Sequence, residues 1–371
     1  MPPAAKTQQW SAMLVGTFAA WFVLNISLNY YNSRVLRGTN FHFPFLLTLV
    51  NKLVGFIIAV TLMLCSKGLP NPQELGAQFL RPIVHVQGVA TALNIGFNNW
   101  SLVEITLTMN QILKSTAPLW TAPLSMIFEG KTFSWQLWGS MSVLVVGCVM
   151  AAWGALADEP ILGILLCLLS VLSQATWTVS SAVLMQMGEK PLDAVSLLFV
   201  SGPTCMLTLF IFFAFRELPL ISDPDSFHDV PPAYMMCIYL GVAASLASCY
   251  DFVHNHFVKL TSSVNMAIMG NTKLAVLIGL SMATMESPPT VLRVLGVVVA
   301  FLGVIWYAWF SLQPKPPAPV ADEKTGTQGD EKTQPLKPTE ATELLKKDDE
   351  KPKSFIGGLF GGSKQAADDK V

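Results

Sequence analysis

Charged residues are scarce in this chain. Only 13% of its 371 residues are charged, whereas soluble domains carry about a quarter. The shortage is uneven, because residues 314–371 hold 21 of the 47 charges and the first 313 residues hold the other 26. That remaining density is too low to cover a water-soluble body of this size, and a net charge of −1 without a basic stripe disfavours nucleic-acid binding. The composition therefore indicates a polytopic membrane protein with a solvated tail.

Cysteine is also sparse, and the usual signatures of enzymes and metal sites are missing. The six cysteines lie in apolar runs without a CxxC pair, so we expect packed free thiols and no disulfide or zinc set. The sequence has no HExxH, P-loop or GxSxG motif and no acidic metal cluster, which predicts that the protein is not an enzyme and needs no cofactor. The His254-Asn255-His256 triplet is interpreted as a polar cap at the membrane interface.

Long apolar stretches account for most of the chain. A bilayer core of about 30 Å needs about 20 apolar residues in a helix. Ten such stretches are separated by charge, proline and glycine, which stop helices at the interface. The sequence thus predicts an all-α polytopic membrane protein with ten transmembrane helices, at residues 10–31, 43–65, 82–103, 106–128, 134–156, 160–186, 194–216, 232–256, 264–285 and 289–312.

The predicted helices form one ten-span translocator domain at residues 10–312. The tail at 313–371 is rich in Pro, Lys, Glu and Thr, which predicts disorder. An even number of spans puts both termini on one side, and the positive-inside rule makes that side the cytosol. Arg34, Arg37 and Arg216 then lie outside. The larger inside set is Lys6, Lys67, Arg81, Lys131, Lys190, Lys259 and the lysines of the tail.

The two halves of the domain show signs of an internal repeat. Lys114 precedes Glu129 by 15 residues, Lys273 precedes Glu286 by 13, and a glycine follows ten residues after each glutamate. A repeat of five helices has to be inserted with opposite topology, and inverted repeats are typical of secondary transporters. The proposed repeats are 10–156 and 160–312, and their small-residue ends are 139–151 and 296–308.

Five ionisable residues lie within predicted spans, where each costs about 2.5 to 3.5 kcal/mol. They are Lys52, Lys114, Asp251, Lys273 and Arg293. Asp251 and Arg293 lie near the ends of their spans, which favours a structural role, and Lys52 fits either a structural or a binding role. Lys114 and Lys273 occupy equivalent central places in the two repeats. Because no acid is expected deep in the membrane, the two lysines predict a site for a phosphate or diphosphate.

Polar residues near these lysines are candidates to bind the rest of the ligand. They are Asn94, Asn98, Asn99, Asn110, Gln111, Gln174, Thr176, Trp177, Tyr250, Asn255, Asn271 and Thr272. Each is individually as well explained by hydrogen bonds between helices. As a set they exceed what the packing of ten helices requires.

Several short motifs are similar to a known transporter family. Residues 99–102, 111–118 and 129–131, residues 29–36 with Phe43-Pro44, and residues 270–273 with 296–307 resemble the triose-phosphate and nucleotide-sugar translocator family of the drug/metabolite transporter superfamily. The resemblance covers residues 10–312 and implies that Lys114 and Lys273 are the family's substrate-binding lysines. Leu274 stands where plastidic phosphate translocators carry an arginine, and neither their third-span histidine nor a transit peptide is found. These departures favour the nucleotide-sugar branch, whose members reside in the Golgi or endoplasmic reticulum.

The sequence therefore predicts a secondary antiporter that exchanges a nucleotide sugar for a nucleoside monophosphate by alternating access. Exchange of a sugar phosphate or other organic phosphate for inorganic phosphate is the alternative within this class. A membrane regulator or enzyme without transport activity is the alternative from another class. The expected partners are a small anionic substrate and membrane lipid, and a homodimer is left open.

Overall fold

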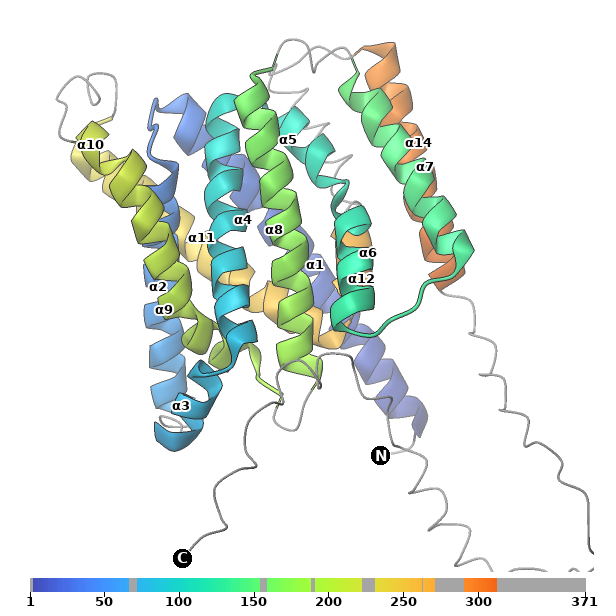
Figure 1. Ribbon diagram of the computed structural model, residues 1–371, viewed down its shortest axis with the longest axis horizontal. Helices are drawn as coiled ribbons and strands as arrows, with labels where there is room; N and C mark the ends of the chain where they lie inside the picture. Colours follow the sequence, from blue (N-terminus) through green and yellow to red (C-terminus); the bar gives the residue numbers. More distant parts are fainter. Residues whose placement is uncertain are drawn as a thin grey trace, which may run out of the picture. The chain divides into compact units, whose positions relative to one another are not determined.

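A computed structural model describes residues 3–66, 72–153, 159–187, 191–221, 231–261, 263–270 and 290–311. The described residues up to Phe310 belong to one compact unit. Within the described ranges all regular secondary structure is helical (Figure 1). The helices are α1 (Pro3–Gly38), α2 (Pro44–Ser66), α3 (Pro72–Phe79), α4 (Pro82–Glu104), α5 (Leu107–Lys114), α6 (Ala117–Phe128), α7 (Trp135–Ala152), α8 (Ile161–Gln186), α9 (Ala194–Arg216), α10 (Leu218–Ile221), α11 (Ala233–Leu260), α12 (Ser263–Met269) and α14 (Val291–Ser311).

Five of the described helices are long and apolar enough to cross a membrane. They lie in α1, α2, α8, α9 and α11, and shorter apolar helices lie in α7 and α14. The all-helical membrane architecture is thereby confirmed, whereas the count of ten spans stays a prediction. α4 is less apolar than these helices. Its polar side chains Gln87, Asn94, Asn98 and Asn99 are all buried inside the bundle. Most of the ninth predicted span, and the tail from residue 312, lie outside the described residues.

The fourth predicted span is not one continuous helix. The chain turns at Ser115 and Thr116, so α5 ends at Lys114 and α6 begins at Ala117. The break coincides with Pro118, which has no N–H to donate to the carbonyl of Lys114. The break therefore puts Lys114 at the carboxyl end of one half-helix and beside the amino end of the next.

α7 and α14 pack with their backbones in contact, and Figure 1 shows the two helices side by side. A Cβ atom added to Gly147 would lie 2.2 Å from the backbone N of Ala300, and one added to Gly296 would lie 2.2 Å from the backbone N of Ala151. Only glycine permits this approach, which maximises van der Waals contact between membrane helices. The two small-residue segments that the sequence matched as repeat ends are thus packed against each other.

Glu217 and Glu129, which directly follow two of the predicted spans, connect the ends of different helices. Glu217 is fully buried, and its carboxylate accepts hydrogen bonds from the backbone N–H groups of Phe45 (2.6 Å) and Leu46 (2.7 Å) at the start of α2. Those N–H groups have no partner within their own helix, and the helix dipole favours an anion there. Glu129, after α6, accepts a hydrogen bond from Ser263 at the start of α12. Burial raises the pKa of Glu217 to about 7, against the lowering effect of its two backbone donors.

All six cysteines are free thiols. Cys148, Cys167 and Cys205 are buried as expected, but Cys65, Cys237 and Cys249 are exposed on the helix surface. The expectation of packing was therefore wrong for three of the six. Apolar residues also face outwards on membrane helices, so an apolar sequence context does not tell a packed thiol from an outward-facing one.

Candidate functional site

Two cavities meet at Lys114 inside the helical bundle. The first, which we call the amide cavity, is lined by seven asparagines: Asn25, Asn29, Asn32, Asn51, Asn94, Asn98 and Asn99. The second, the aromatic cavity, includes Trp21, His254 and Gln111 in its lining. Lys114 and Gln174 line both. A ligand that contacts Lys114 therefore has room on either side of it.

Lys114 carries a positive charge that the described part of the chain does not balance. Across those residues, no carboxylate lies within ion-pair distance of its ammonium group. The amino end of α6 adds positive potential, because Ala117 and Thr121 from its first turns also line the aromatic cavity. An unpaired ammonium inside the membrane is unfavourable, so the site is suited to an anion.

Lys52 differs from Lys114 because it has a partner. Its Nζ lies 2.5 Å from Asp251 Oδ2, and the two residues are 9% and 4% exposed. The sequence placed Asp251 near the end of its span, but α11 runs on to Leu260, nine residues further. Asp251 therefore lies further from the end of its helix than the sequence predicted, and its pairing with Lys52 agrees with the structural role expected for it.

Amide side chains connect the helices around the cavities. Gln111 Nε2 donates to Asn110 Oδ1 (3.0 Å), and Asn110 Nδ2 donates to Asn98 Oδ1 (3.1 Å). Four lining residues have amide oxygens that accept no hydrogen bond from the described residues: Asn32, Asn51, Gln111 and Gln174. Buried acceptors without donors are costly. The cavities therefore favour an occupant that presents N–H or O–H groups.

A row of asparagines on α1 lines the amide cavity, and the sequence reasoning did not single it out. Asn25, Asn29 and Asn32 all line this cavity. Their spacing of four and three residues puts them on one helix face, and this period was the signal that could have found them. Asn25 Nδ2 donates to the hydroxyl of Tyr250 (3.0 Å), which connects α1 to α11. The predicted site residue Tyr250 thus lines the amide cavity with them.

Aromatic rings lie close to both cavities. Trp177, which lines the amide cavity, stacks on His254 with ring centroids 4.1 Å apart and an angle of 11°. Trp21 Nε1 donates to His254 Nδ1 (3.3 Å). The expectation that residues 254–256 form an interfacial cap was wrong for His254 and Asn255, which are 1% and 0% exposed, because α11 extends beyond the predicted span.

The remaining predicted site residues are not brought to these cavities, or lie outside the description. Asn255 is buried in α11 but is not among the residues that line either cavity. Asn271, Thr272 and Lys273 lie outside the described residues. Gly270, which directly precedes them, lines the aromatic cavity.

A bundle of apolar helices around polar, cationic cavities is the architecture of a membrane transporter. The chain belongs to the Triose-phosphate Transporter family, whose model matches residues 12–308. A crystal structure with a TM-score of 0.51 covers 81% of this chain and 97% of its own, at 13% identity, so the two share a fold. The resemblance read from the sequence motifs is confirmed at the level of the family.

Curated relatives have several stated substrates. A probable sugar phosphate/phosphate translocator of Arabidopsis thaliana is 25% identical over 297 residues, which cover 80% of this chain and 83% of the relative. UDP-uronic acid transporter 1 of the same plant is 24% identical over 83% of this chain and 97% of its own. The chloroplastic phosphoenolpyruvate/phosphate translocator 3 of rice (Oryza sativa subsp. japonica) is 26% identical over 82% and 75%, respectively. The family and these relatives are transporters, not enzymes.

Proposed function

We propose that this protein exchanges a nucleotide sugar for a nucleoside monophosphate across a membrane by alternating access. Lys114 and Lys273 bind the phosphates, and the polar and aromatic side chains around them contact sugar and base. Gln111, Asn98 and Tyr250 are among the side chains that contact sugar and base. Asn271 and Thr272, which directly precede Lys273, are assigned to the same role. Each relative named above is a translocator or transporter, and all three are named for phosphorylated or nucleotide-linked substrates, which supports a phosphorylated substrate.

One observation carries the preference for a nucleotide sugar: Lys114 lies between two cavities of different chemistry. The amide cavity has oxygen acceptors that need donors, and sugar hydroxyl groups supply them. The aromatic cavity has the rings of Trp21 and His254 in its lining, which a base can contact. A molecule with phosphates between a sugar and a base matches this order of contacts.

Obligatory exchange follows from the unpaired charge. The binding site has to be occluded from both sides during the return step, and an empty occluded site would leave Lys114 without a counterion in a medium of low dielectric constant. A bound anion removes that penalty, so the return is fast only with a second substrate. The lack of a plastidic arginine after Lys273 supports a Golgi or endoplasmic reticulum membrane. The excess of lysine and arginine in the predicted inside loops supports cytosolic termini.

Exchange of a sugar phosphate for inorganic phosphate is the second candidate. It is favoured by the names of the probable sugar phosphate/phosphate translocators, which match this chain at similar identity to the UDP-uronic acid transporter. The two candidates differ in the counter-substrate. Inhibition by nucleoside monophosphate but not by phosphate supports the first, and the reverse supports the second.

The decisive assay is counterflow in proteoliposomes preloaded with nucleoside monophosphate or phosphate. We expect Lys114→Gln and Lys273→Ala to abolish uptake, because each removes a cation that binds the substrate phosphates. Lys259→Gln is the matched control, since Lys259 is an exposed lysine near the end of α11. Wild-type uptake of every nucleotide sugar and sugar phosphate by either site variant would refute the proposed binding site.

A further inference from the structure

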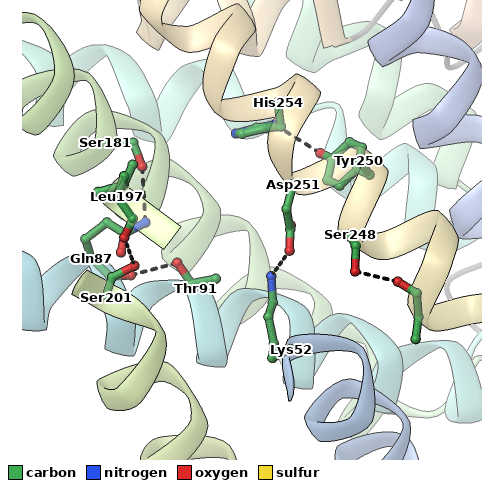
Figure 2. A network of polar contacts seen from close by, with 11 residues as sticks. Lys52, Gln87, Thr91, Ser181, Leu197, Ser201, Ser248, Tyr250, Asp251 and His254 are labelled. Atoms are coloured by element: carbon green, nitrogen blue, oxygen red, sulfur yellow. Dashed lines mark hydrogen bonds and ion pairs between the residues drawn. The ribbon is translucent and has the colours of Figure 1, made fainter. Parts of the chain in front are cut away.

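The Lys52–Asp251 ion pair forms a wall between two cavities. It lines the amide cavity on one side and, on the other, a side cavity that is also lined by Gln87, Ser201 and Cys205. Figure 2 shows the pair between α2 and α11, with the Gln87 and Ser201 cluster beside it. Both side chains are buried, so the pair is part of the interior of the transporter.

The pair determines the charge that this wall presents to a ligand. Lys52, Asp251 and Lys114 are the charged residues among the described lining of the amide cavity. The charges of Lys52 and Asp251 cancel at 2.5 Å, which leaves Lys114 as the source of net positive charge in that lining. The wall formed by α2 and α11 is therefore neutral, although it contains a lysine.

Stability alone does not explain such a pair. Removing two charges from water is expensive, and buried ion pairs are often no more stabilising than apolar residues of the same size. Loss of only one partner, by contrast, leaves a buried charge uncompensated. Without the Asp251 carboxylate, the Lys52 ammonium would give this wall a net positive charge and make it a second binding site for an anion.

We propose that Asp251 is a specificity-determining residue: by neutralising Lys52 it restricts this wall to an uncharged, hydroxyl-bearing part of the substrate. A substrate with an additional carboxylate at this position meets the Asp251 carboxylate and no free cation. Hydroxyl groups instead find an acceptor, since the amide oxygen of Asn51, which lines the amide cavity with the pair, accepts no hydrogen bond from the described residues. The inference rests on the proposed function, because it concerns selection among phosphorylated substrates.

The test uses ligands that differ by one carboxylate. UDP-glucose is compared with UDP-glucuronate, and glycerol 3-phosphate with 3-phosphoglycerate, so that both candidate substrate classes are covered. Purified full-length protein is assayed by ligand-induced thermal shift and by counterflow in proteoliposomes. In the substrate class that it transports, wild-type protein should prefer the member without the carboxylate. Asp251→Asn leaves the charge of Lys52 uncompensated. The ratio of uptake of the carboxylated member to uptake of the member without the carboxylate should then rise at least tenfold.

Two further variants separate charge from packing. Adding Lys52→Met to Asp251→Asn removes the freed cation and should cancel the gain of the carboxylated ligand. Glu104→Gln removes one negative charge at the end of α4, outside the cavities, and should leave the ratio unchanged.

The outcomes are distinct. A wild-type preference for the carboxylated member, or an unchanged ratio in transporting Asp251→Asn protein, overturns the inference and leaves the proposed function in place. Binding and transport of no nucleotide sugar or sugar phosphate by wild-type protein overturns the proposed function, and the inference with it. If Asp251→Asn does not fold, the wild-type preference still decides.

Discussion

Replacing Lys114 by methionine should change stability in opposite directions with and without ligand. Without ligand, the substitution removes an ammonium that no described carboxylate balances, and methionine fills a similar volume without charge. Relief of an uncompensated buried polar group is worth about 1 to 3 kcal/mol. The melting temperature of the empty protein should therefore rise.

With ligand, the same substitution removes an attraction. An ammonium about 4 Å from a phosphate charge contributes roughly 4 kcal/mol at an effective dielectric constant of about 20. A loss of that size weakens binding by about three orders of magnitude. The stabilisation that a nucleoside monophosphate gives the wild-type protein should therefore disappear from Lys114→Met at the same ligand concentration.

The measurement is a thermal-unfolding series in detergent, with and without ligand, for the wild type, Lys114→Met and Lys259→Met. The Lys259 variant controls for loss of a lysine at an exposed position. Lys114→Met should have the same melting temperature with and without ligand. That temperature should be higher than the melting temperature of the wild type without ligand. A variant that is destabilised when empty but still stabilised by ligand would refute the reasoning, because Lys114 would then be a structural residue with a partner.

Three other predictions concern packing, pH and the tail. Gly147→Val should destabilise the protein by roughly 1 to 3 kcal/mol in thermal unfolding, because its Cβ meets the backbone of α14; the control Gly241→Ala, with nothing within 4 Å of its Cβ, should be neutral or slightly stabilising. Folded Glu217 has a pKa of about 7 against an ordinary 4.5. Its contribution to the free energy of unfolding is therefore complete below pH 4.5 and is lost as the pH rises to 7. Glu217→Gln should flatten that part of the stability profile, and an identical slope in both proteins would contradict the assignment. Truncation before Lys315 should leave transport in liposomes intact, and loss of transport by a folded truncated protein would show that the tail contributes.

The membrane architecture and the key lysine were readable from the sequence because both depend on local chemistry. Hydropathy over about 20 residues decides whether a segment enters a bilayer, so the bounds of α4, α8 and α9 agree closely with the predicted spans. Lys114 stood out because a charge in such a segment is costly wherever the segment packs. The turn after it was also encoded locally, by Pro118, but apolar composition concealed it.

Partnerships between distant residues were decided by the tertiary structure alone. Lys52 and Asp251 are 199 positions apart, and Glu217 reaches Phe45 across 172. A charged side chain has no periodicity that identifies its partner, so the sequence could count buried charges but could not pair them. Packing of α2 against α11 turned Lys52 from a candidate ligand residue into half of an ion pair. The sequence by itself determined that this is a membrane transporter with too few charges to be soluble. Only the fold decided that, among the described residues, Lys52 is paired with Asp251 whereas Lys114 has no carboxylate within ion-pair distance.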